Sequence, residues 1–131
     1  MENKYDLEDR LLEFATEIIR LVEQMPATRA ANHVSGQILR SGTSPLFNHG
    51  EAQAAESPKD FLHKLRICLK ELRETKRALR LIMNAALVDD MDKATTLLNE
   101  SDELIRIFVA SIRTAGQKIL RESDAEGYDS G

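Results

Sequence analysis

The chain has 131 residues, of which 42% are hydrophobic and 31% are charged, and its formal net charge is −4. These proportions are typical of a single globular domain, and they exclude an intrinsically disordered chain. The negative balance, taken alone, also argues against a dedicated nucleic-acid-binding protein.

Neither a disulfide nor a membrane anchor is expected. The one cysteine, Cys68, has no partner for an internal disulfide, which favours a reducing compartment. No apolar run reaches the roughly 20 residues of a membrane span, and the first residues lack the basic and apolar regions of a secretory signal. We therefore expect a cytoplasmic protein with no membrane partner.

Helical periodicity runs along almost the whole chain, and no segment alternates apolar and polar residues as a half-buried strand would. Apolar residues recur every three or four positions from Leu7 to Met25, and Pro26 ends this first segment. Ser57 and Pro58 form a typical start for the third segment. The predicted helices span about residues 5–25, 28–55, 58–87 and 90–121.

Four long amphipathic helices joined by short links predict an all-α fold, an antiparallel up-and-down four-helix bundle. We expect this single bundle to occupy residues 1–121. The residues after Arg121 are polar, so residues 122–131 are predicted to form a disordered tail.

The second predicted helix contains residues that disfavour a helix interior. These are Gly36, Ser41, Gly42, Ser44, Pro45 and Gly50. An interior glycine costs up to about 1 kcal/mol and an interior proline about 3 kcal/mol. Two explanations are open. Either the small residues let another helix or subunit approach closely, or Pro45 kinks the helix.

Polar residues also recur along one side of this helix, at spacings of three and four. If the turn at Ser57 joins antiparallel helices, facing residues have numbers that sum to about 111. Arg40 then faces Glu71, and Gln37 faces Glu74. We therefore predict a structural polar network that comprises Gln37, Arg40, Ser44, Asn48, Glu51 and Glu71.

Charge is concentrated in the third predicted helix, because residues 57–88 hold eight Lys or Arg against three Asp or Glu. Its cations recur every three or four positions and define a basic stripe: Lys59, His63, Arg66, Lys70, Arg73, Arg77 and Arg80. The stripe is either a solvated face, paired with acidic residues of neighbouring helices or subunits, or a track for a phosphate backbone. No aromatic residue is interleaved for stacking on bases, so nucleic-acid binding would depend on the backbone. The candidate nucleic-acid-binding residues are Lys59, Arg66, Lys70, Arg73, Arg77 and Arg80.

The sequence contains no recognisable catalytic or metal-binding motif. His33, His49 and His63 lack cysteine or carboxylate partners at metal-ligand spacings, and no Gly-rich phosphate loop or nucleophile elbow occurs. Cys68 lies on the apolar face of its helix and is expected to be buried in the core. We therefore predict a protein that is not an enzyme, with no catalytic residues, metal, cofactor or small-molecule substrate.

A long ordered run of residues links the second and third helices. It comprises Gln37-Ile-Leu-Arg-Ser-Gly-Thr-Ser44, Asn48, Glu51-Ala-Gln, Glu56-Ser-Pro-Lys-Asp-Phe61 and Leu65-Arg-Ile-Cys-Leu-Lys-Glu71-Leu-Arg-Glu-Thr75. This run resembles the 23S rRNA-intervening-sequence protein family, and the resemblance extends over about residues 7–120. The chain departs from that family at Pro45, which is displaced by one position from the proline of some relatives, and at His49, which replaces an apolar residue.

The resemblance implies a small bacterial four-helix bundle that assembles into a ring, typically a homopentamer. Related bundles act as accessory proteins of reverse transcriptases in diversity-generating retroelements, and they engage nucleic acid and the polymerase through a basic surface. The resemblance therefore implies RNA, DNA or a reverse-transcriptase-like protein as a partner. The polar positions of the family correspond to the six residues of the predicted polar network.

Two hypotheses follow for the function. The first is a non-enzymatic, homo-oligomeric scaffold that binds nucleic acid through the basic stripe. The alternative is a protein–protein interaction or structural module with no nucleic-acid role, in which the same cations pair with acidic neighbours. Reversing the charge of Lys70, Arg73 and Arg77 together separates the two, because it removes either nucleic-acid binding or the oligomer.

Overall fold

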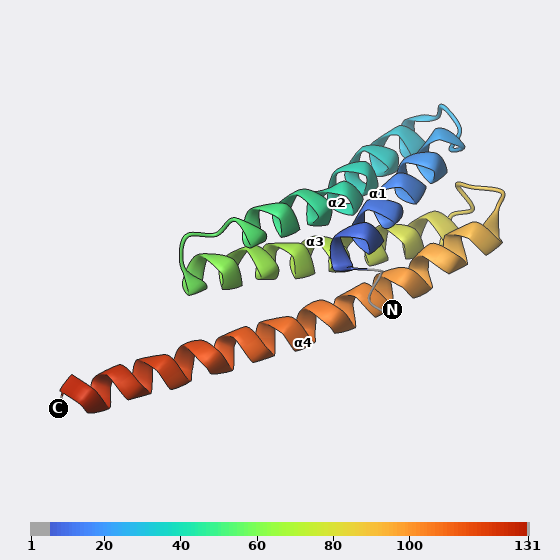
Figure 1. Cartoon of the computed structure of the whole chain (residues 1–131). Helices are drawn as coiled ribbons and strands as arrows, with labels where there is room; N and C mark the ends of the chain where they lie inside the picture. The colour runs from blue at the N-terminus through green and yellow to red at the C-terminus, as the bar shows by residue number, and fades with distance from the viewer. Residues whose placement is uncertain (1–5, 131) are drawn as a thin grey trace.

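The structure, a computed structural model, describes residues 6–130, and it describes the side chains of residues 6–125. The described residues form four α-helices and no strand (Figure 1). The helices are α1 (Leu7–Glu23), α2 (Arg29–Gln53), α3 (Pro58–Asn84) and α4 (Met91–Ser130). Each helix packs against its neighbour in the chain, and α4 returns to contact α1. The predicted antiparallel four-helix bundle is confirmed.

Each helix begins where a polar side chain replaces a missing backbone partner. In each case the side-chain oxygen accepts a hydrogen bond from the backbone N–H three residues later, which stabilises a helix by about 1 kcal/mol. These capping residues are Asp6, Thr28, Ser57 and Asp90. Helix α3 ends in a hydrogen bond from the Leu87 N–H to the Ile82 carbonyl, and Ala86 between them has a positive φ of 54°. That C-terminal turn stops α3 at Asn84, three residues before the expected end.

The core is formed by the apolar stripes that the periodicity identified. Its largest fully buried side chains include Leu11, Phe14, Ile18, Leu21, Ile38, Leu72, Leu79, Ile82, Leu104 and Phe108. Helix α1 has 17 residues, whereas α2 has 25 and α3 has 27, so α1 covers only part of the bundle. The far end of the α2–α3 hairpin therefore faces α4 without α1 between them (Figure 1).

Helix α2 runs through Pro45 as one helix, and Pro45 is buried inside it. A Cβ atom on Gly42 would lie 2.9 Å from both Cγ atoms of Ile18 in α1. Close approach of another helix therefore explains Gly42, in agreement with the first of the two explanations. A Cβ atom on Gly36 or Gly50 would meet no other described part of the chain within 4 Å, so packing among the described residues explains neither glycine.

The last part of the chain differs from the prediction. Residues 122–131 were expected to be a disordered tail, but α4 continues as a helix to Ser130 and extends beyond the α2–α3 turn (Figure 1). The physical reason is that no helix breaker follows Arg121 until Gly127, and extending an existing helix is much easier than starting one. Residues 1–5 of the predicted bundle and residue 131 of the predicted tail lie outside the described residues.

Candidate nucleic-acid interface on helix α3

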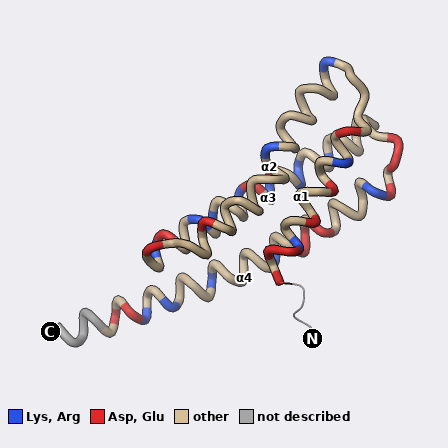
Figure 2. The backbone as a smooth tube through the Cα atoms, turned by 45° about the horizontal axis from the view of Figure 1, so that its top comes forward, with Lys and Arg blue, Asp and Glu red and all other residues tan. Residues whose placement is uncertain are grey.

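The basic stripe lies on the outer face of α3. The opposite face carries the buried side chains of the bundle core, Cys68 and Leu72 among them. All seven residues of the stripe are exposed to solvent: Lys59, His63, Arg66, Lys70, Arg73, Arg77 and Arg80. Figure 2 shows the Lys and Arg positions along α3. The helical rise of 1.5 Å per residue gives the stripe a length of about 32 Å from its first residue to its last.

Ion pairing distinguishes the stripe from the other cations of α3. Lys64 and Lys76 lie on the flanks of the helix, where Lys64 Nζ is 2.7 Å from Glu51 Oε1 in α2 and Lys76 Nζ is 2.7 Å from Asp102 Oδ1 in α4. The hydrogen bond to Glu51 raises the pKa of Lys64. Among the described side chains, no residue of the stripe forms an ion pair. The acidic side chains that the structure describes therefore leave the stripe unneutralised.

The predicted contact between Arg40 and Glu71 is present. One Arg40 nitrogen donates to Glu71 Oε1 at 3.0 Å, and the other donates to Glu74 Oε1 at 3.0 Å. Glu74 was expected to face Gln37, and the two residues line the same small cleft, while the fork of the Arg40 guanidinium binds the carboxylates of both Glu71 and Glu74. The hydrogen bond to Glu74 and the charge of Glu71 raise the pKa of Arg40. Glu71 is buried and Arg40 is exposed, so this ion pair links α2 to α3 at the solvent-exposed edge of their contact, which we call the α2–α3 seam.

The other predicted polar residues do not join this pair in a continuous network. The Asn48 side-chain amide donates to the Ser44 hydroxyl at 2.8 Å and to the Ser44 carbonyl at 3.1 Å, so these two residues satisfy each other one turn apart. Glu51 pairs with Lys64. Gln37 lines a small cleft of about 280 Å³ between α2 and α3. Within the described part of the chain, the six residues thus occupy separate places along one seam.

Thr75 is a buried polar contact that the sequence reading missed. Its hydroxyl donates to the Glu71 carbonyl at 2.8 Å and lies 2.9 Å from the Ser41 hydroxyl, which joins α3 to α2. The signal was available, because Thr75 continues the apolar series of Cys68, Leu72 and Leu79 at helical spacing.

His49 was also missed as a structural residue. It is buried in α2, and its ring stands edge-on to Phe108 with the ring centroids 6.4 Å apart. Its Nδ1 lies 3.5 Å from Glu8 Oε1 and has no hydrogen-bond partner. A search of the described residues finds no group of three or more His, Cys, Asp or Glu side chains that could hold a metal ion.

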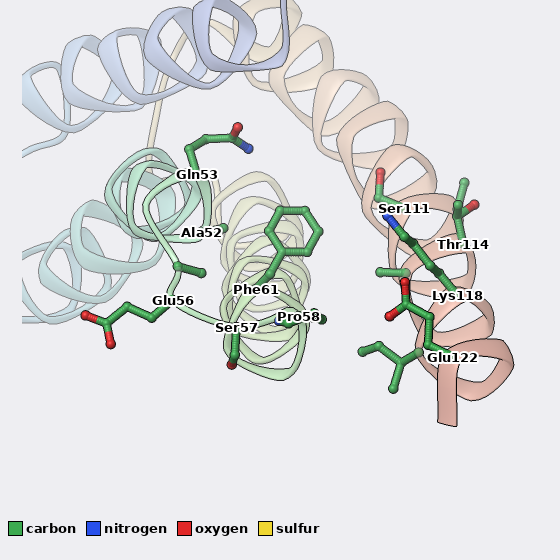
Figure 3. A pocket seen from close by; sticks show the side chains of 14 residues that line it. Ala52, Gln53, Glu56, Ser57, Pro58, Phe61, Ser111, Thr114, Lys118 and Glu122 are labelled. Atoms are coloured by element: carbon green, nitrogen blue, oxygen red, sulfur yellow. The ribbon is translucent and has the colours of Figure 1, made fainter. Parts of the chain in front are cut away.

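A groove opens at the end of the bundle that α1 does not cover. Its volume is about 790 Å³, and it lies between the α2–α3 turn and α4. Phe61 and Gln53 point into it from one side, and Thr114 and Lys118 line it on the α4 side (Figure 3). Most of its surface is apolar, and Glu122 and Lys118 are its charged residues on α4.

None of the described helices is long and apolar enough to cross a membrane.

Comparison with known proteins identifies the family. The family model described as 23S rRNA-intervening sequence protein matches residues 4–110. The chain belongs to this family. It is also similar to a crystal structure from Bacteroides thetaiotaomicron, described as a protein with unknown function from the S23 ribosomal protein family. The two share 35% sequence identity with a TM-score of 0.74, over 80% of this chain and 96% of that chain. No curated protein matches the sequence.

Membership in the 23S rRNA-intervening sequence protein family agrees with the four-helix fold, and neither the family description nor that of the similar structure names an activity. The family match ends at residue 110, before the part of α4 that extends beyond the bundle. The match includes the whole basic stripe.

Proposed function

We propose that the protein is a non-enzymatic, homo-oligomeric scaffold that binds the phosphate backbone of nucleic acid through the basic stripe of α3. The observation that carries this proposal is the contrast within α3. The flanking cations Lys64 and Lys76 are paired, whereas the six Lys and Arg residues of the stripe are exposed and unpaired among the described residues. A row of unpaired cations about 32 Å long can replace the counterions of several phosphates.

The net charge of the whole chain, −4, does not oppose this proposal strongly. Charges separated by more than about 8–10 Å in physiological salt are largely screened, so a phosphate on α3 interacts chiefly with the stripe. The absence of aromatic residues from the stripe favours binding to the backbone with little preference for sequence. The partner that fits this chemistry is structured RNA or duplex DNA in the cytoplasm.

Oligomerisation would strengthen the binding. Several copies present several stripes, and the second contact with one nucleic acid is then intramolecular, so a modest affinity per copy becomes a high avidity. The family resemblance leads us to expect five copies in a ring, with a reverse-transcriptase-like protein as a further partner. Light scattering of the purified protein measures the number of copies.

The deciding experiment is a salt titration of the protein against structured RNA and duplex DNA. Each phosphate contact contributes a slope of about −0.9 in log K against log [salt] for duplex DNA. If half of the stripe engages phosphates, one copy should give a slope of roughly −3. The variant Lys70→Glu, Arg73→Glu, Arg77→Glu should lose binding and keep its oligomeric state.

A matched control carries the same change of charge elsewhere. Arg113, Lys118 and Arg121 on α4 are exposed and unpaired among the described residues, so reversing these three should leave most of the binding intact. Absence of binding by the parent protein even at low salt would contradict the proposal. If the α3 variant also lost its oligomeric state, the alternative protein–protein module would be correct, with the stripe paired to acidic residues of neighbouring copies.

A further inference from the structure

One face of the bundle exposes large apolar side chains across the junction of α1 and α2. Leu12 and Ile19 of α1 are 52% and 44% exposed, and Leu39 and Phe47 of α2 are 37% and 67% exposed. We call this surface the α1–α2 face, and it consists of Leu12, Thr16, Ile19, Leu39, Thr43 and Phe47. Exposed apolar side chains that occur singly are ordinary, but a contiguous group of them marks an interaction site.

The contacts of α1 place its part of this face beside α2. Glu8 reaches His49 of α2, whereas Arg10 and Glu17, on the other side of α1, reach Glu100 and Lys93 of α4. Leu12 follows Glu8 by four residues and Ile19 follows it by eleven, so they share its side of the helix.

The contacts of α2 place its part of the face beside α1. Ser41 contacts Thr75 of α3, Gly42 faces Ile18 of α1, and Thr43 lies one further step of about 100° around the helix. Leu39, Thr43 and Phe47 are four residues apart and therefore form one row on the outward flank of α2, with Leu39 on its α1 side and Phe47 on the side of Arg40. The ten residues 41–50 contain no Lys, Arg, Asp or Glu.

Two glycines on the same flank have no explanation within the chain. Gly36 and Gly50 are exposed, and a Cβ atom on either would meet nothing within 4 Å. Glycine in a helix interior is unfavourable, and α2 has two such residues seven positions on either side of Thr43. A second helix that approaches this flank closely from outside would account for both, in the way that Ile18 accounts for Gly42.

The spacing of these residues is symmetric about Thr43. The order Gly36, Leu39, Thr43, Phe47, Gly50 has intervals of 3, 4, 4 and 3. A second α2 that runs antiparallel, with Thr43 opposite Thr43, places Leu39 opposite Phe47 and Gly36 opposite Gly50. A contact about a two-fold axis requires this kind of self-complementary pattern, because each residue meets its counterpart twice.

Charges at the ends of α2 agree with the same register. Residue n then faces residue 86 − n of the other copy, so Arg29 at the start of one α2 lies opposite Ser57, one residue from Glu56, after the end of the other α2. Arg29 and Glu56 are exposed, and neither forms an ion pair among the described residues. The pairing occurs twice in a two-fold contact, and it favours a second copy of the chain over an unrelated partner.

We infer that the α1–α2 face binds the same face of a second copy, with the two α2 helices antiparallel about a two-fold axis at Thr43. The inference specifies the homo-oligomeric part of the proposed function and rests on it. The basic stripe is on a different helix and stays exposed in this arrangement. Contacts within a ring of five copies are head-to-tail, so in that case the two-fold contact would join two rings.

Disulfide cross-linking tests the two-fold axis. In a Thr43→Cys variant, mild oxidation should convert most of the protein to covalent dimers, because a residue on a two-fold axis meets its own counterpart. Cys68 does not compete, since it is fully buried in the core. A Thr95→Cys variant, with the cysteine at an exposed site on α4, is the matched control and should stay uncross-linked. Absence of covalent dimers from Thr43→Cys overturns the inference, whether the protein is monomeric or oligomeric by light scattering.

Two pairs of variants test the packing. Phe47→Lys should weaken self-association at least tenfold in sedimentation equilibrium, whereas Leu120→Lys, at an exposed apolar side chain on α4, should not.

Gly36→Ala should raise the melting temperature of the dilute monomer and weaken association, whereas Gly116→Ala should only raise the melting temperature. Unchanged association in both Phe47→Lys and Gly36→Ala would contradict the inference. If the parent protein bound no nucleic acid while Thr43→Cys still formed covalent dimers, the proposed role of the basic stripe would be wrong and the two-fold contact would stand. Failure of the proposed function and failure of this inference are therefore distinguishable.

Discussion

At the scale of single residues, the seam between α2 and α3 depends on a few polar side chains with distinct environments. Arg40 reaches across it to a buried carboxylate, Glu71, and to a more exposed one, Glu74. Thr75 and Ser41 form a second contact beneath them, with both residues buried. Pairs of this kind fix the register of two helices more than they stabilise the fold, because desolvation offsets much of the Coulomb attraction.

We predict that Arg40→Ala lowers the free energy of unfolding by about 1–2 kcal/mol, because it leaves the buried Glu71 carboxylate without its partner. In a Glu71→Gln background the same substitution should cost less than half as much. Urea unfolding of the four proteins of this double-mutant cycle measures both values. Arg73→Ala, at an exposed and unpaired position of the stripe, is the control and should change stability by less than about 0.5 kcal/mol. Equal losses in the two backgrounds would show that Arg40 acts independently of Glu71.

Cys68 makes the stability of the protein sensitive to alkaline pH. Burial raises the pKa of its thiol from 9.0 to about 12. The folded protein therefore keeps the proton at pH values where the unfolded chain loses it, so stability is complete below pH 9 and falls as the pH rises toward 12. Between pH 8 and pH 10 the parent should lose about 1 kcal/mol more than Cys68→Ala in urea unfolding. Parallel pH profiles for the two proteins would contradict this prediction.

At the scale of helices, the small residues of α2 have different causes although they look alike in the sequence. Gly42 is required by the crossing with α1, whereas a Cβ atom on Gly36 or Gly50 would have no neighbour within 4 Å among the described residues. Pro45 lies within the buried side of the same helix, and the Cys68 thiol donates to its carbonyl at 3.6 Å. The helix is held in place by packing with α1 and α3 rather than by its intrinsic propensity.

Gly42→Ala tests the crossing of α1 and α2. The new Cβ would lie 2.9 Å from two carbon atoms of Ile18, which is fully buried and cannot move freely. Overpacking costs about 1–3 kcal/mol and outweighs the gain of up to about 1 kcal/mol in helix propensity, so we expect a net loss of about 1 kcal/mol in thermal unfolding. Gly116→Ala on α4 is the control and should be neutral or stabilising. A stabilised Gly42→Ala protein would mean that the crossing is looser than described.

At the scale of the whole molecule, charged side chains fall into two groups: those that form ion pairs between helices and those that stay unpaired on the surface. Paired charges join α1 to α4 through Arg10–Glu100 and Lys93–Glu17, and they join α3 to α4 through Lys76–Asp102. The hydrogen bond from Lys93 lowers the pKa of Glu17. Individual surface pairs contribute at most about 1 kcal/mol, so their main effect is to set the register of the helices. The unpaired cations are left on the outer face of α3, where the salt titration and the charge-reversal variants test them.

The outward faces of the bundle also divide by chemistry. The basic stripe occupies α3, while the α1–α2 face is apolar and carries the self-complementary row of α2. One face is suited to a polyanion and the other to a second copy of the chain. The cross-linking and salt-titration experiments address the two faces separately.

The sequence by itself determined the number of helices, where each begins and which faces are buried, because apolar periodicity and capping residues such as Ser57 act over a few neighbouring positions, but it placed the end of α4 too early. It also predicted the contact of Arg40 with Glu71, since the short turn at Ser57 fixes which residues of α2 and α3 face each other. Only the tertiary structure decided which cations are neutralised, because Lys64 and Lys70 differ in the neighbours that other helices bring to them. The same holds for the exposed row at Phe47, which is one more apolar residue in the sequence and becomes part of a surface only when α1 leaves it uncovered.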